Sequence, residues 1–477
     1  METRRYAARR VTAARSVTAG VFWRRVLLGG ILALALAVRF REPLASPVIG
    51  AEDPYLHMAR TWDLLDGHLS TDYPPGFVIL LAPFALLGPE VFAFVARFLP
   101  PFLGVVQVLG VYLLCRENLR TPAALVAATC VALMPENILR TNLLFPTALD
   151  LALLPFFLLH LLRATRGERI SLAWCAGIAL VLGVAHPWVL VYMMPPAIAA
   201  AFLMMRRKVD RVVGIVALGL LALAALLFAF LPGTWNPAPA FLQNAGPRAL
   251  ELLRDPRTIL PLPMYVDSFP GMVSWSVIAL AGVGVLTALV RRTPIGIVAL
   301  VYALSIVPFV FVDWFDVWFI PHRSVAYLSL GMAILAALPV ELMGALPEWN
   351  MGDVAAAAVI GTYLVLAMTG PAFDVTPWYR LYDEDDYAAW DAIDDRDPSL
   401  VISGSWQGAV GYRAITGNDA LYNPTFFQSG EAQAHDTRQH PDAIVLLDAF
   451  AREDGVRPPS GWREVGRWGD TRAYAAP

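Results

Sequence analysis

The chain has 477 residues, of which 57% are hydrophobic and only 16% charged, and its formal net charge is −3. This composition excludes an ordinary soluble protein and is typical of a helical protein that crosses the membrane several times. The near-neutral charge argues against nucleic acid as a partner.

The N-terminal segment, residues 1–25, is basic and precedes a first apolar run at 26–39. We expect this run to remain as a membrane span, because Arg39 and Arg41 follow it without a small-residue cleavage site. Ten further runs predict spans near 90–114, 121–135, 143–162, 171–186, 188–205, 211–231, 273–291, 294–312, 323–343 and 354–370. The run at 77–88 is too short to cross and is expected to be re-entrant or interfacial.

The positions of the arginines support this set of spans. With a cytoplasmic N-terminus, the basic loops all fall on the cytoplasmic side, as the positive-inside rule expects. These loops are 115–120, 163–169, 206–211 and 291–292. The transmembrane part, 26–370, then has outer loops at 40–89 and 232–272.

The tail, residues 371–477, differs from the rest of the chain. It contains nine arginines and eighteen acidic residues, a net charge of −9. Short apolar runs at 399–404 and 443–450, with turn-forming residues such as 416–419 between them, are typical of strands. We expect a small extracytoplasmic α/β domain. The three cysteines form no CxxC pair, so we expect neither a disulfide framework nor a thiolate metal site.

The first outer loop contains "AEDPYLHMARTWDLLDGHLSTDYPPG" (51–76). At helical spacing, Asp53, His57 and Arg60 share one face. A carboxylate facing the membrane surface suits a hard divalent cation that bridges a phosphorylated donor. The alternative is a solvated amphipathic helix resting on lipid headgroups.

Two further regions place charged residues on the expected outer side of the membrane. Arg140 lies at the outer end of one expected span, and Asp150 lies about two turns into the next. A carboxylate at membrane depth is costly, so Asp150 is predicted either to join Asp53 in a metal site or to pair with an arginine. Arg323, beside His322, suits a phosphate at the interface, with snorkelling to headgroups as the alternative. His186 is interpreted as a packed interfacial histidine.

Together these features resemble the catalytic subunits of oligosaccharyltransferases, especially the archaeal ones, within the GT-C class of membrane glycosyltransferases. The stretch 51–76 is similar to the family's first-loop motif and its "YP.G" turn, and 96–118 is similar to its second span. "PENILR" (135–140) resembles the approach to the second acidic motif. "HRSVAYLSLGMAIL" (322–335) resembles the span whose arginine contacts the lipid-linked pyrophosphate, and 401–428 resembles the block holding a Trp-Trp-Asp-Tyr-Gly signature.

The resemblance implies a mostly α-helical bundle of about 11–13 spans with an outer α/β domain. It also implies transfer of a glycan from a polyprenyl-linked phosphate or pyrophosphate, with Mg²⁺ or Mn²⁺ as cofactor. Asp53 would bind the metal and face the acceptor, Arg140 would precede the second motif, and Arg323 would hold the donor phosphate.

The chain departs from the family at three places. Thr147 stands where the second motif has its first acid, which leaves Asp150. The signature block has Trp406 without an adjacent aspartate, and loop 232–272 offers only Glu251 and Asp267 as replacements for a glutamate motif. We therefore expect a divergent glycosyltransferase whose acceptor, a protein, lipid or glycan, is not a standard sequon. A catalytically inactive glycolipid-binding relative and a transporter of lipid-linked sugars remain alternatives.

Overall fold

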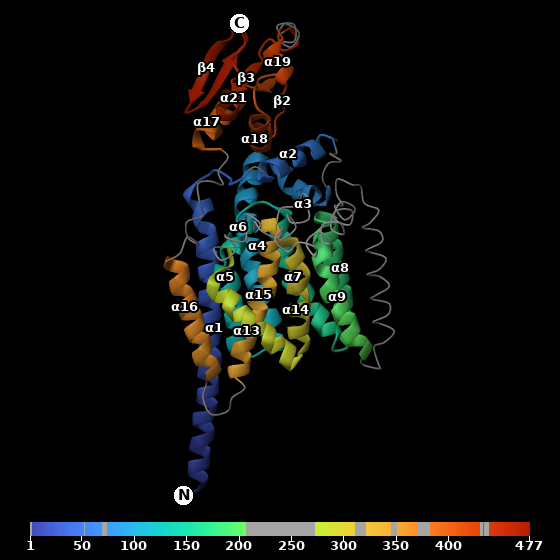
Figure 1. Cartoon of the computed structure of the whole chain (residues 1–477). Coiled ribbons are helices and arrows are strands. Elements are labelled where there is room, and N and C mark those ends of the chain that lie inside the picture. Colours follow the sequence, from blue (N-terminus) through green and yellow to red (C-terminus); the bar gives the residue numbers. More distant parts are fainter. Residues whose placement is uncertain are drawn as a thin grey trace, which may run out of the picture.

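The computed structural model describes residues 2–51, 53–68, 74–206, 272–310, 321–344, 351–369, 382–429, 433 and 438–477. It consists of a bundle of helices with a small α/β domain at one end, and the N-terminus lies at the other end (Figure 1).

The bundle is built from α1 (Glu2–Ala45), α2 (Asp53–Leu65), α3 (Gly76–Ala85), α4 (Pro89–Asn118), α5 (Thr121–Leu133), α6 (Pro135–Arg140), α7 (Pro146–Ala164), α8 (Ile170–Ala185), α9 (Val189–Arg206), α13 (Trp275–Arg291), α14 (Pro294–Val310), α15 (Pro321–Met343) and α16 (Met351–Thr369). Four of the described helices are long and apolar enough to cross a membrane: α4, α7, α9 and α15. Each expected span coincides with a helix, except 211–231, which lies outside the described residues. Helix α3 has ten residues, too few to cross.

Helix α15 is the centre of the bundle. In its most apolar window 89% of the residues are buried, and it packs against α5, α13 and α14. A helix that is buried on all sides needs apolar residues on every face, so its sequence is a continuous hydrophobic run, and the run at 323–343 predicts this span.

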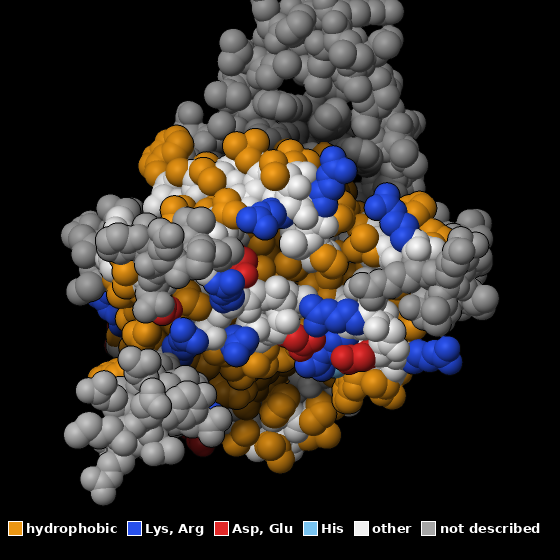
Figure 2. Space-filling view, turned by 90° about the horizontal axis from the view of Figure 1, so that it is seen from below, with side chains coloured by type: hydrophobic (Ala, Val, Ile, Leu, Met, Phe, Trp, Pro, Cys, Tyr) orange, Lys and Arg blue, Asp and Glu red, His pale blue; other side chains and the backbone are white. Residues whose placement is uncertain are grey.

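The basic loops meet at the end of the bundle opposite the α/β domain, where Figure 2 shows many arginine side chains. Arg163 of α7 binds Glu117 of α4, and Arg120 lies 3.7 Å from Glu341 at the end of α15. The described loops grouped by the positive-inside rule, 115–120, 163–169 and 291–292, therefore share one end.

The C-terminal domain contains α17 (Glu384–Asp394), β1 (Val401–Ser403), α18 (Trp406–Thr416), β2 (Ala420–Tyr422), α19 (Pro424–Gln428), β3 (Ile444–Leu447), α21 (Ala449–Glu453), β4 (Arg463–Trp468) and β5 (Thr471–Ala475). Its sheet has the order β2-β1-β3-β5-β4, in which β1 is parallel to β2 and β3 while β5 is antiparallel to β3 and β4. The expected strands at 399–404 and 443–450 correspond to β1 and β3. The expected turn at 416–419 holds Gly417, whose φ of +80° ends α18.

The C-terminal domain rests on α2, the helix of the first loop. Trp62 donates from Nε1 to the Ala414 carbonyl at 3.2 Å, and the Tyr55 and Tyr387 hydroxyls are 2.8 Å apart. Arg413, only 7% exposed, forms ion pairs with Asp63 and Asp66. Helix α2 is thus held between the bundle and the domain.

Candidate active site

Asp53 and Arg323 meet at the end of the bundle that carries the C-terminal domain. Arg323 Nη2 donates to Asp53 Oδ2 at 2.7 Å. The carboxylate belongs to the first turn of α2, where the free backbone N–H groups favour negative charge. The guanidinium lies near the start of α15. Both side chains reach solvent, with 41% of Asp53 and 26% of Arg323 exposed, so the pair can be approached from outside.

The guanidinium of Arg323 is fixed by an aromatic ring and retains an open donor. Its Cζ lies 5.7 Å from the centre of the Phe145 ring, within cation–π range. Its Nε is buried and has no hydrogen-bond partner among the described residues. A buried N–H without an acceptor is costly, so this nitrogen is suited to an oxygen that a ligand brings.

Arg140 is a second arginine whose guanidinium lies near the Phe145 ring. It forms an ion pair with Glu136 at 2.7 Å inside α6, and its Cζ is 5.9 Å from the Phe145 ring. Only 2% of the Arg140 side chain is exposed, so its charge is compensated before any ligand arrives.

Asp150 is held in a buried polar network. Its Oδ2 lies 2.5 Å from His186 Nδ1 and also accepts a hydrogen bond from the Tyr327 hydroxyl. Thr147 contacts the same hydroxyl. Helix α7 begins at Pro146, so Asp150 lies one turn into it rather than the two turns expected, because proline favours the first helical position. Because the partners of Asp150 are His186 and Tyr327, the expected pairing with an arginine is wrong.

The same network fixes the rotation of α15 about its axis. Tyr327 follows Arg323 by one helical turn, and its ring lies 4.5 Å from that of Tyr192. The Tyr192 hydroxyl is 3.0 Å from Ser324 Oγ. Asp150 thus acts on the position of Arg323 through α15, without touching it.

His57 is buried beside the pair and is electrically neutral. It is 4% exposed, and its ring packs edge-on against Phe77. Burial lowers the pKa of His57 to about 3, and the positive charges of Arg60, Arg323 and His186 contribute to the same shift. His57 can therefore orient or hydrogen-bond a substrate but brings no positive charge near neutral pH.

Of the remaining predicted residues, only Trp406 has a described side chain. Trp406 is 40% exposed at the first turn of α18, whereas Arg413 and Ala414, near the other end of that helix, are the residues that contact α2. Glu251, Asp267 and the side chain of His322 lie outside the described residues.

The described side chains do not fit the expected divalent cation. They contain no group of three or more histidine, cysteine, aspartate or glutamate residues placed to hold a metal ion. Asp53 is engaged by Arg323, and Asp150 is fully buried against His186 and Tyr327. Oxygen ligands for Mg²⁺ must converge on one point, and these two carboxylates have different partners instead.

Tyr327 is a site residue that the sequence did not single out, and His186, interpreted there as a packed interfacial histidine, is the hydrogen-bond partner of Asp150. His186 lies 36 positions from Asp150 and Tyr327 lies 177 positions from it, so no local spacing joins them. The available signal was Asp150 itself, because a carboxylate at membrane depth demands a partner.

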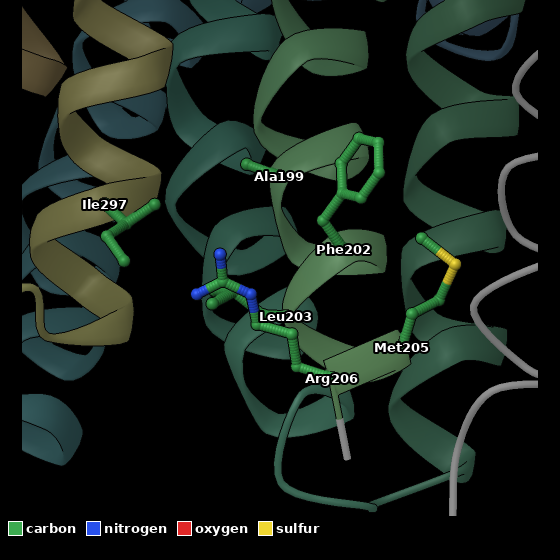
Figure 3. Close-up of a pocket in the computed structure, with 6 residues that line it drawn as sticks. All are labelled: Ala199, Phe202, Leu203, Met205, Arg206 and Ile297. Atoms are coloured by element: carbon green, nitrogen blue, oxygen red, sulfur yellow. The ribbon is translucent and has the colours of Figure 1, made fainter. Parts of the chain in front are cut away.

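A pocket at the other end of the bundle is separate from this site (Figure 3). It lies between α9 and Ile297 of α14, and Arg206 is its one charged lining residue.

Comparisons with known proteins agree with this architecture. A sequence profile described as dolichyl-phosphate-mannose-protein mannosyltransferase matches residues 72–232, less than half of the chain. The matched segment contains Arg140, Asp150 and His186 but neither Asp53 nor Arg323. No curated protein matches the chain in sequence.

Solved structures share the fold over most of the chain. The oligosaccharyltransferase of Archaeoglobus fulgidus, in complex with Zn and sulfate, aligns over 88% of this chain and 68% of its own at 17% identity, with a TM-score of 0.55. ArnT from Cupriavidus metallidurans, bound to undecaprenyl phosphate, aligns over 94% and 98% at 12% identity, with a TM-score of 0.56. Its apo state aligns over 96% and 100% at 12% identity, with a TM-score of 0.55. The chain thus has the fold expected from the resemblance, a multi-span helical bundle followed by a mixed α/β domain, and shares it equally with ArnT.

Proposed function

We propose that this protein is a membrane glycosyltransferase that transfers a sugar from a polyprenyl-phosphate-linked donor to an acceptor at the end of the bundle bearing the C-terminal domain. The observation that carries this proposal is the contact between Asp53 and Arg323, which brings a carboxylate and a guanidinium together in a site that solvent reaches. The family profile and the ArnT complex with undecaprenyl phosphate support the class of donor.

The two residues divide the reaction between them. The acceptor's oxygen or nitrogen attacks the anomeric carbon of the sugar, and the bond from that carbon to the phosphate oxygen breaks. Asp53 takes the proton that the acceptor loses, as a general base. Arg323 donates to the phosphate oxygens as the polyprenyl phosphate leaves with the bonding electrons.

The charges of the site favour a donor with one phosphate rather than a pyrophosphate. Arg323 is the partly exposed cation that contacts Asp53, whereas Arg140 is buried and paired with Glu136. His57 is neutral near physiological pH because burial lowers its pKa. One guanidinium matches the single negative charge of the donor's phosphodiester, while a pyrophosphate would bring a further negative charge into the same space.

The acceptor is proposed to differ from a standard sequon. The block at 401–428 folds as a strand, a loop and helix α18, yet it places no acid beside Trp406. Trp406 instead presents an exposed aromatic face, which suits a sugar or peptide surface better than a single hydroxyl.

Proteoliposomes with a labelled polyprenyl-phosphate sugar test the proposal. The wild-type protein should release polyprenyl phosphate and transfer label to a co-reconstituted membrane extract, and Asp53→Ala should abolish both. Asp391→Asn, which removes an exposed acid of α17, is the matched control and should keep activity. Donor binding without release would indicate the inactive glycolipid-binding relative. Movement of intact donor between leaflets would indicate a transporter.

A further inference from the structure

We propose that Asp53 and Arg323 form a latch that the donor phosphate opens. In the structure the base and the phosphate-binding residue are paired with each other. The phosphate displaces Asp53 from Arg323, and only then is the carboxylate free to accept the proton of the acceptor. This inference rests on the proposed function and adds an order to it, in which the donor binds first and the acceptor second.

The geometry of the pair favours displacement by a phosphate. A single bond joins Arg323 Nη2 to Asp53 Oδ2, while Arg323 Nε is buried without a partner among the described residues. A phosphate has several oxygens and can engage two guanidinium nitrogens at once, an arrangement stronger than a one-point contact. It would also satisfy the open Nε.

The surroundings assign the movement to Asp53 rather than to Arg323. The guanidinium is positioned over the Phe145 ring, and the next residue, Ser324, is tied to Tyr192. Asp53 is 41% exposed and lies at the first turn of α2. After release from Arg323 its charge is still stabilised by the helix N-terminus and by water. A small rotation of the Asp53 side chain is enough, because α2 itself is held by Tyr55, Trp62 and Arg413.

The latch has a chemical consequence. While Asp53 is paired, its Oδ2 is occupied by Arg323 and is not available to an acceptor. Once the phosphate occupies Arg323, the base and the anomeric carbon are present together, so proton acceptance is coupled to the presence of donor.

Binding of undecaprenyl phosphate to the full-length protein in nanodiscs, measured by native mass spectrometry, tests the latch. Asp53→Asn removes the competing charge while keeping the shape of the side chain. It should bind the lipid phosphate about threefold to tenfold more tightly than wild type and lose transfer, since a part-exposed ion pair is worth about that much. Asp53→Ala should bind more tightly in the same way. Arg323→Gln should lose most of the binding.

Asp63→Asn is the matched control, because it removes the same charge from the same helix but from a carboxylate that contacts Arg413. Its affinity for undecaprenyl phosphate should equal that of the wild type. The latch is overturned if Asp53→Asn and Asp53→Ala both bind undecaprenyl phosphate no more tightly than Asp63→Asn does while unfolding at the same temperature. That result leaves the proposed function standing. Absence of binding by the wild type itself overturns both.

Discussion

His186 Nδ1 lies 2.5 Å from Asp150 Oδ2, and the two residues, 36 positions apart, are both buried. The contact joins the end of α8 to the start of α7. It also leaves Asp150 Oδ1 buried without a hydrogen-bond partner among the described residues. A carboxylate in this position is a structural anchor, because removing any one partner leaves a desolvated polar group.

Removal of Asp150 should therefore destabilise the protein as well as inactivate it. We expect Asp150→Ala to lower the unfolding free energy by about 1–3 kcal/mol, the usual cost of leaving a buried hydrogen-bonding group without its partner. Thermal unfolding in detergent measures this, and His186→Ala and the double variant complete a cycle. A coupling energy above about 1 kcal/mol is expected for residues in direct contact. Additive effects would contradict the anchor.

The Arg413 contacts should control how well α2 presents Asp53. Arg413 is buried between α18 and α2 and pairs with Asp63, Asp66 and Asp419, so Arg413→Gln leaves three carboxylates facing a neutral amide. We expect a loss of about 2–3 kcal/mol in stability and a fall in kcat with little change in the affinity for lipid phosphate. Limited proteolysis near residues 66–75 should become faster. Arg396→Gln, at an exposed arginine of the same domain, is the control and should change neither kcat nor the rate of proteolysis.

The apolar runs predicted the helical bundle well because each span is a local property of the chain. A window of uncharged residues identifies α4 or α15 without reference to any partner. The domain was predicted from β1 and β3, whose apolar runs are continuous, whereas β4, with the sequence "REVGRW", has exposed charged positions and no such run.

The residues of the candidate site could be predicted where the signal is local, but their contacts with distant residues could not. Asp53 and Arg323 were identified through the resemblance, yet their direct contact spans 270 positions and could not be read from either motif. The docking of Arg413 on α2 spans about 350 positions, and no spacing rule reaches that far. The expected depth of Asp150 was misjudged because the helix start was placed before Pro146.

The buried imidazole of His57 should make the protein sensitive to acid. Its pKa falls from 6.5 to about 3 on folding, chiefly through burial. Above pH 6.5 the residue is neutral in both states, and its contribution to stability is constant. As the pH falls from 6.5 toward 3, the unfolded chain takes up a proton that the folded protein refuses, and stability is lost.

Unfolding midpoints measured between pH 7.5 and 4.5, a window chosen to span the ordinary pKa of histidine, isolate this effect. The midpoint of the wild type should fall more steeply below pH 6.5 than that of His57→Gln. His440→Gln, at a histidine of the C-terminal domain that contacts Ser399, should keep the wild-type slope. Parallel slopes for wild type and His57→Gln would show that this histidine is not held neutral.

Gly104 of α4 should tolerate no side chain, because a Cβ there would overlap Arg39 and Thr141. Arg39 is fully buried and donates to Thr141 Oγ1 and to the carbonyls of Val131 and Ala132, the last carbonyls of α5. Gly104→Ala should lower the unfolding free energy by about 1–3 kcal/mol through overpacking. Gly177→Ala, in the open on α8, should be neutral or stabilising. Equal midpoints for the two variants would mean that Arg39 can move aside.

Chelation of divalent cations should leave transfer intact. The resemblance predicts Mg²⁺ or Mn²⁺, but Asp53 is paired with Arg323, Asp150 is hydrogen-bonded to His186 and Tyr327, and the described residues contain no group of three His, Cys, Asp or Glu side chains placed to hold a metal ion. With Arg323 supplying the positive charge that stabilises the leaving phosphate, the reaction needs no cation at that position. Release of polyprenyl phosphate should therefore proceed at the wild-type rate after dialysis against EDTA, and Arg323→Gln should not be rescued by Mn²⁺. Loss of activity in EDTA that added Mn²⁺ restores would refute this, and would show that Asp53 exchanges Arg323 for a metal whose other ligands come from residues such as Glu251 or Asp267.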